Sequence, residues 1–169
     1  MSYKHQRDYT RLKKEWTTHM PMILKVLLSS EGPVCEIGGG PFSTPILHWL
    51  CKIQNRKLVT YENHPEYYYF CHRFSSVGHK VRFIENWDDM DFKTHWGVVF
   101  IDHHPAQRRS IDMINFKDNA DYLIMHDTED QKLYGWENAW PHFKYRYDWK
   151  DCRPWTTVVS NKFPLEFLK

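Results

Sequence analysis

Three consecutive glycines within the stretch PVCEIGGGPFST, residues 33–44, restrict the fold of this chain more than any other feature. An apolar run before them has the pattern of a short buried strand, and an apolar pattern typical of a helix follows them. Glycines at such a turn allow positive φ and carry no Cβ, so a ligand can lie against the backbone and the free N–H groups of the first helical turn. We therefore expect a ligand site at Gly38, Gly39 and Gly40, with an ordinary tight turn as the alternative.

Apolar strands alternate with helical patterns along the rest of the chain. The predicted strands cover residues 34–37, 57–62, 80–84, 96–101, 122–125, 144–149 and 156–161. The predicted helices cover residues 3–16, 20–28, 44–53, 64–75, 107–116 and 134–143. Most strands end in polar residues and alternate with helices, which indicates an α/β fold with a parallel sheet covered on both faces. The last two strands are joined too briefly for a crossover helix, so we expect an antiparallel hairpin.

The composition indicates one globular domain. With 169 residues, of which 41% are hydrophobic, the chain can bury one core and is short for two domains. We expect a single domain over residues 1–169, with an N-terminal helical segment over 1–30 and a ligand-binding core over 33–161. The net charge of +2 makes a nucleic-acid partner unexpected. A basic cluster near the N-terminus leaves RNA as an alternative, and it comprises Lys4, Arg7, Arg11, Lys13 and Lys14.

The sequence also carries expectations about compartment and partners. No apolar run approaches the ~18 residues of a membrane span, and the first 16 residues lack a signal-peptide core. We therefore expect a cytoplasmic protein without a membrane partner. Aromatic residues make up 17% of the chain, more than a core of this size needs, so some of them should line a ligand site or a subunit contact. A homo-oligomer is thus one open alternative.

Ionisable side chains directly follow two strongly apolar strands. Asp102, His103 and His104 come after one of them, and His126 and Asp127 come after or at the end of the next. The carboxyl ends of parallel strands meet at one edge of a sheet, where open α/β folds bind their ligands. We therefore expect these side chains to face one crevice.

A carboxylate also ends the second predicted strand. Glu62 lies 22 positions after Gly40. Dinucleotide-binding βαβ units place an acid on the ribose hydroxyls at an offset of about 20 residues. Together with the glycine turn, Glu62 therefore predicts a nucleotide-like ligand.

At this point the chain resembles the class I S-adenosylmethionine-dependent methyltransferases, over roughly residues 34–161. The first motif of that family, an acid followed by glycines, reads EIGGG at residues 36–40, and the following GPFSTPIL looks like a Ser-Thr variant found in small-molecule or sugar methyltransferases. The resemblance implies a Rossmann-like, doubly wound, mostly parallel sheet of about seven strands. It further implies an antiparallel C-terminal hairpin and helices on both faces.

The resemblance implies S-adenosylmethionine (SAM) as the cofactor. By analogy, the glycine backbone passes along the methionine moiety and Glu62 holds the ribose. Asn86 and Trp87 match the position that contacts adenine, and Asp102 matches a position near the reactive sulfonium. The cofactor-binding residues implied in this way are Glu36, Gly38, Gly39, Gly40, Ser43, Thr44, Glu62, Asn86, Trp87 and Asp102.

The sequence also narrows the methyl acceptor. The motif DHHP at residues 102–105 differs from the Asn/Asp-Pro-Pro-aromatic motif of amino-group DNA methyltransferases. The chain is also short for the family and shows no substrate-recognition insert beyond residues 131–150. We therefore expect an O-methyltransferase that acts on a small-molecule or sugar-like acceptor. Two alternatives are a SAM-binding protein of the same fold that degrades or senses SAM, and a non-enzymatic interaction module. Arg108 and Arg109 are candidates to bind an anionic acceptor, with a solvated helix face as the alternative.

Methyl transfer to a hydroxyl needs a group that takes the acceptor proton. His103, His104 and His126 are the candidate bases because imidazole titrates near neutrality, and Asp102 is expected to stay ionised beside them in the reaction centre. Asp102 and Asp127 can also share Mg²⁺ or Mn²⁺. In the alternative, Asp127 caps the next helix.

Overall fold

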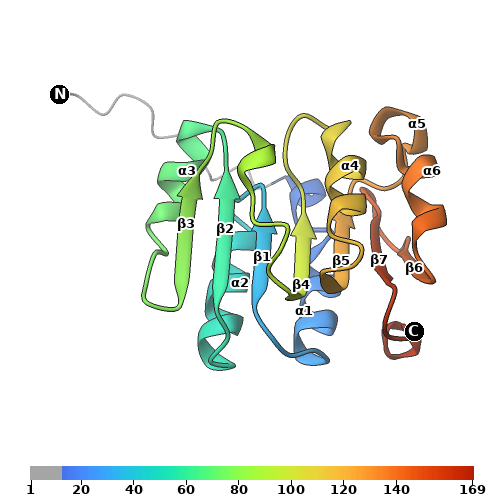
Figure 1. The fold of residues 1–169 in the computed structure, drawn as a ribbon, viewed down its shortest axis with the longest axis horizontal. Helices are drawn as coiled ribbons and strands as arrows, with labels where there is room; N and C mark the ends of the chain where they lie inside the picture. Colours follow the sequence, from blue (N-terminus) through green and yellow to red (C-terminus); the bar gives the residue numbers. More distant parts are fainter. Residues whose placement is uncertain (1–12) are drawn as a thin grey trace.

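The computed structural model describes residues 13–169 (Figure 1). The predicted helix over residues 3–16 falls mainly outside this part of the chain, as do Lys4, Arg7 and Arg11. Its described end is a short 3-10 helix, η1 (Lys14–Trp16). No helix in residues 13–169 is long and apolar enough to cross a membrane.

Seven strands form one sheet in the order β3-β2-β1-β4-β5-β7-β6 (Figure 1). Their bounds are β1 (Val34–Ile37), β2 (Leu58–Glu62), β3 (His79–Phe83), β4 (Trp96–Ile101), β5 (Ala120–His126), β6 (Tyr145–Trp149) and β7 (Thr156–Ser160). The first five strands pair in parallel, whereas β7 pairs antiparallel with both β5 and β6. The predicted α/β fold, with its doubly wound sheet and antiparallel C-terminal hairpin, is confirmed.

Helices cover both faces of the sheet, as predicted. Their bounds are α1 (Met20–Leu28), α2 (Ser43–Ile53), α3 (Pro65–His72), α4 (Arg108–Asn115), α5 (Gln131–Tyr134) and α6 (Trp136–Ala139). One apolar cluster contains the inward residues of α1 and α2, and a second contains those of α4 and α6. Every residue of β1 and β4 is buried between these layers, which explains their near-continuous apolar sequence.

The helix predicted over residues 134–143 is found only in part. This segment is divided among the end of α5, α6 and the 3-10 helix η3 (Trp140–His142). Gly135 separates the two α-helices with φ at 69°, a left-handed conformation that ends a helix. The sequence pattern shows the apolar spacing of Tyr134, Trp136 and Trp140, but not the break between them.

The strand order reverses between β1 and β4, which lie side by side although α2, β2, α3 and β3 lie between them in the sequence. Their register aligns Ile37 with Ile101, so both strands end at the same level of the sheet. The glycine turn follows the first strand, and Asp102 follows the second. This switch point is where open α/β sheets form their ligand crevice.

Candidate functional site

A cavity of about 660 Å³ opens at the carboxyl ends of the central strands. This volume lies within the range of about 300–1,000 Å³ that is typical of small-molecule sites. The predicted site residues that line it are Gly38, Gly39, Gly40, Ser43, Glu62, Asp102, His103, His104, His126 and Asp127. Those that do not are Glu36, Thr44, Asn86 and Trp87. The structure thus brings most of the predicted site into one cavity.

The three positions of the glycine turn differ in why a side chain is absent. Gly38 adopts φ of 84°, and a Cβ there would lie 2.6 Å from the backbone of His103. A Cβ on Gly39 would overlap Cys71 Sγ. A Cβ on Gly40 would meet only Ser43 Oγ, at 3.7 Å. The first two glycines are therefore required by packing inside the protein, and Gly40 is the one whose missing side chain leaves open space.

Glu62 holds the turn through its carboxylate. Its Oε2 accepts a hydrogen bond from Gly39 N at 2.9 Å, and its Oε1 accepts from Asn63 N at 2.8 Å and His64 N at 2.7 Å. Burial raises the pKa of Glu62, and these three backbone bonds oppose the shift. A carboxylate offers about four acceptor sites, so one remains for a ligand in the cavity.

Glu36 lies beneath the glycine turn and is fully buried. Thr60 Oγ1 donates to its Oε2 at 2.6 Å, and Thr44 Oγ1 lies 2.9 Å from both of its oxygens. Thr44 Oγ1 also accepts a hydrogen bond from Gly40 N at 3.0 Å. Burial raises the pKa of Glu36 to about 7. In this geometry Glu36 and Thr44 position the turn from behind.

The two predicted adenine contacts lie beside the cavity. Asn86 Oδ1 accepts from Asp88 N at 3.0 Å and so caps the 3-10 helix η2 (Trp87–Asp89). Trp87 is buried, and its Nε1 donates to His104 O at 3.0 Å. Its ring centroid is 4.3 Å from that of His103. The contacts of Trp87 hold the loop after β4, and the roles of Asn86 and Trp87 toward adenine stay predictions.

The adjacent histidines after β4 point to different environments. The His103 side chain is fully buried, with Nε2 3.0 Å from Asp112 Oδ2 on α4. Burial lowers its pKa, although Asp112 opposes the shift. Its contribution to the cavity therefore comes from the backbone. His104 is exposed and lines the cavity, so it is the one of this pair that can reach a bound molecule.

Asp102 and Asp127 lie close together, as the sequence predicts, and a guanidinium bridges them. Arg109 Nη1 is 2.9 Å from Asp102 Oδ1 and 2.8 Å from Asp127 Oδ2. Its Nε and Nη2 donate to the carbonyl oxygens of His103 and Asp102. Burial alone would raise the pKa of Asp102, but Arg109 and His126 outweigh it and hold that pKa well below its usual range.

This arrangement bears on two further predictions. Arg109 is buried and forms ion pairs with Asp102 and Asp127, so it is not placed to bind an anionic acceptor. Arg108 pairs with Asp88 and Asp112. A metal shared by Asp102 and Asp127 stays a prediction, and Arg109 already occupies one oxygen of each carboxylate.

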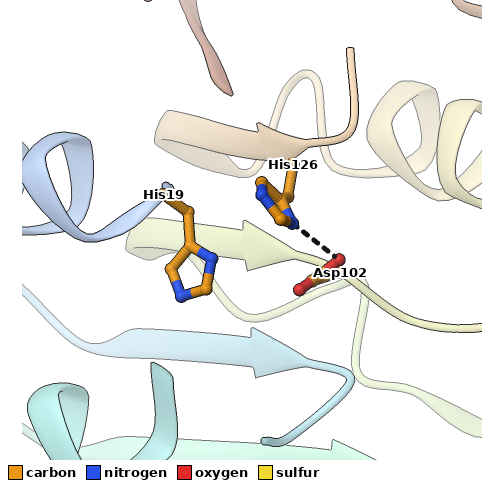
Figure 2. A group of neighbouring side chains, drawn as sticks. All are labelled: His19, Asp102 and His126. Carbon is orange, nitrogen blue, oxygen red and sulfur yellow. Dashed lines mark hydrogen bonds and ion pairs between the residues drawn. The ribbon is translucent and has the colours of Figure 1, made fainter. Parts of the chain in front are cut away.

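Sequence reasoning missed His19 and Thr18. His126 is buried, with Nε2 2.9 Å from Thr18 Oγ1 and Nδ1 3.4 Å from Asp102 Oδ1. Burial lowers the pKa of His126, but Asp102 reverses the shift and leaves it raised. His19 is 2% exposed, and its ring centroid lies 4.8 Å from that of His126 (Figure 2). Burial lowers the pKa of His19 to about 3.

The position of His19 explains why it was missed. It immediately precedes α1 and carries no motif that relates it to β4 or β5. Only the packing of α1 against these strands brings it to the cavity. A lone histidine before an apolar helix gives no sequence signal of this contact.

No protein-family model and no curated protein sequence matches the chain. Solved structures of methyltransferases do resemble it. The O-methyltransferase TomG from Streptomyces achromogenes, in complex with SAM, has a TM-score of 0.61 at 12% identity, over 86% of this chain and 79% of that chain. Ribosomal protein L11 methylase from Lactobacillus delbrueckii subsp. bulgaricus has a TM-score of 0.63 at 13% identity, with the same two coverages of 86% and 79%.

A third similar structure covers slightly more of the chain. Precorrin-6y C5,15-methyltransferase from Geobacter metallireducens has a TM-score of 0.59 at 15% identity, over 90% of this chain and 92% of that chain. These three enzymes have different acceptors by name, so what they share with this chain is the architecture. The chain has the fold of the class I S-adenosylmethionine-dependent methyltransferases.

Proposed function

We propose that the protein is a SAM-dependent methyltransferase that acts on an oxygen of a small-molecule or sugar-like acceptor. One observation carries the proposal. The glycine turn with Glu62, and the group formed by Asp102 and His104, line a single cavity at the switch point of the sheet. A cofactor and an acceptor can therefore meet there.

The part of the cavity beside β1, β2 and α2, which we call the first half, fits the cofactor. Gly40 leaves open space, Ser43 brings the first turn of α2 to the cavity wall, and Glu62 retains one acceptor site for a hydroxyl. When bound, SAM supplies an electrophilic methyl group on a positive sulfonium. The ionised carboxylate of Asp102 favours a cation in the same cavity.

The part of the cavity beside β4, β5 and α1, which we call the second half, supplies side chains that can orient and deprotonate an acceptor. Asp102 is ionised and is fixed by Arg109, so it can orient a hydroxyl without moving. His104 is exposed, lines the cavity and offers an imidazole nitrogen that can take the acceptor proton. His103 is a positioning residue in this proposal, because its ring contacts Trp87 and Asp112.

Calorimetric titration of SAM and its demethylated product tests the first step. The wild type should bind both, and the Gly40→Val variant should lose binding because its side chain fills the open space at the turn. Gly78→Val is the matched control, since a Cβ at Gly78 comes no closer than 4.0 Å to Arg56 O. No heat with the wild type at millimolar ligand would overturn the proposal.

Methyl transfer to a panel of hydroxyl compounds tests the second step. His104→Ala should lower turnover by about 10²–10⁴-fold, which is typical for loss of a general base, with SAM affinity nearly unchanged. His142→Ala is a control at an exposed position. Release of the methyl group without any acceptor would favour a protein that degrades SAM. Binding without turnover of any kind would favour a sensor.

A further inference from the structure

His19 brings a third metal-ligating side chain to the second half of the cavity. It precedes α1, whereas Asp102 follows β4 and His126 ends β5. Figure 2 shows the three side chains turned toward one another, with the His126 to Asp102 contact marked. Each offers one ligand atom, and these three atoms lie within 4.8 Å of one another.

Both ring nitrogens of His19 are buried and have no hydrogen-bond partner within residues 13–169. Burying an imidazole N–H or lone pair without a partner is unfavourable, and native structures contain few such groups. The ring also packs against Phe100, at 5.0 Å between centroids, which fixes it beside the cavity. The structure therefore holds a polar ring in position with its binding capacity unused.

The surroundings resemble the outer contacts of known metal ligands. Thr18 Oγ1 lies 2.9 Å from Nε2 of His126, and this contact leaves Nδ1 facing Asp102. Arg109 contacts Asp102 through Oδ1, and no hydrogen bond or ion pair in the described part of the chain engages Oδ2. Histidines and carboxylates that bind metals are commonly oriented by such second contacts.

The charges favour a cation. Asp102 and Asp127 carry two negative charges, and Arg109 balances one of them. A metal ion binds neutral imidazoles and displaces any proton on His126, so the group of charges that the ion meets has a net charge of about −1. A divalent ion would leave a net positive site, which would favour binding of an acceptor oxygen.

We propose that His19, Asp102 and His126 bind a divalent first-row transition-metal ion, such as Zn²⁺, Mn²⁺ or Fe²⁺. Two of the three donors are imidazole nitrogens, which suit these ions better than Mg²⁺ or Ca²⁺. Three protein ligands with an open face are typical of catalytic metal sites. All three residues line the cavity, so the open face is directed at the space where a ligand can enter.

The role of the ion rests on the proposed function. At this place it would hold an acceptor hydroxyl and lower its pKa, which assists proton loss to His104. Binding of the ion itself does not depend on SAM. Metal binding and methyl transfer can therefore fail separately.

The test is titration of the chelator-treated protein with Co²⁺ and Zn²⁺, without SAM or acceptor, followed by calorimetry and by Co²⁺ absorption. The wild type should bind one ion per chain and show d–d bands of a nitrogen and oxygen site. His19→Phe should lower the affinity by at least ~100-fold, at or beyond the upper end for loss of an outer contact. Phenylalanine keeps a ring against Phe100, and it removes the unpaired nitrogens, so this variant should fold.

Two controls complete the experiment. His142→Gln changes an exposed histidine away from the cavity and should bind the ion like the wild type. Asp127→Asn distinguishes the proposed site from a metal site formed by the carboxylates of Asp102 and Asp127. The proposal is overturned if the wild type binds no ion, if His19→Phe binds as tightly as the wild type, or if only Asp127→Asn abolishes binding. Thermal denaturation of each variant with and without metal shows that the compared proteins are folded.

Discussion

The two halves of the cavity satisfy their buried polar groups in different ways. Beside β1, β2 and α2, the carboxylates of Glu36 and Glu62 accept hydrogen bonds from threonines and backbone N–H groups of the same region. Beside β4, β5 and α1, Arg109 pairs with Asp102, and the His19 ring has no hydrogen-bond partner in the described residues. The first half is nearly complete by itself, whereas the second retains unused donors and acceptors.

This difference separates positioning from chemistry. A carboxylate with several fixed hydrogen bonds holds the backbone in one shape, and it changes little when a ligand arrives. Buried groups with unused capacity gain more from a bound ion or molecule, because their desolvation is not yet compensated. We therefore expect the first half, with the glycine turn, to determine cofactor affinity, and the second half, with the histidines, to determine turnover.

Among the variants that compare the two halves, Asp102→Asn should have the largest effect, and this effect is on turnover. The amide can still accept from Arg109, so folding should change little, but the negative charge beside the reacting groups is lost. Loss of such preorganised charge lowers kcat by about 10²–10³-fold. Steady-state kinetics together with a SAM titration measure both quantities. A fall in SAM affinity as large as the fall in kcat would contradict the proposed division between the halves.

Asp88→Asn is the matched control for that variant. Asp88 pairs with Arg108 on the surface and does not line the cavity. Exposed ion pairs contribute little to stability, typically about 0–1 kcal/mol. Turnover of this control should equal that of the wild type.

Gly38→Ala should cause the next largest change, in stability. The left-handed backbone is unfavourable for alanine by about 1–2 kcal/mol. A Cβ at 2.6 Å from His103 adds overpacking of about 1–3 kcal/mol. Gly40→Ala has open space and should alter the free energy of unfolding by less than about 1 kcal/mol. Chemical denaturation that ranks these two variants equally would show that the turn is more plastic than its contacts indicate.

These glycines also show what a sequence can reveal. The turn, β1 and Glu62 lie close together in the chain, and their spacing reflects local backbone geometry, so the sequence predicts them well. His19 reaches β5 only through the packing of α1. It is separated from His126 by 106 residues, and no sequence motif connects the two. The break at Gly135 comes from its left-handed backbone, and the apolar spacing around it does not show which glycine adopts that conformation. Long-range packing is therefore what the sequence pattern did not contain.

Glu36 should make the stability of the protein depend on pH. Because burial raises its folded pKa to about 7, above the ordinary value of 4.5, the folded protein binds this proton more tightly than the unfolded chain does. The contribution of Glu36 to stability is therefore full below about pH 4.5 and is lost as the pH rises through 7. Glu36→Gln cannot titrate and should lack this decline.

The corresponding measurement compares the free energy of unfolding at two pH values. Relative to the wild type, Glu36→Gln should gain about 2–3 kcal/mol between pH 5 and pH 8. Glu85→Gln, at an exposed position after β3, should follow the wild type at both values. If Glu36→Gln follows it too, Glu36 keeps an ordinary pKa and the threonines stabilise its anion more than burial opposes it.

The smallest effect expected is that of Glu62→Gln on cofactor affinity. Glu62 already accepts three backbone hydrogen bonds, so only its remaining acceptor site and its charge act on a ligand. Losing a charge-assisted hydrogen bond weakens binding by about 1–3 kcal/mol, whereas kcat at saturating SAM should stay near that of the wild type. Calorimetry gives the first quantity and kinetics the second. A large fall in kcat with unchanged SAM affinity would place Glu62 in the chemistry, and the separation between the halves of the cavity would then be wrong.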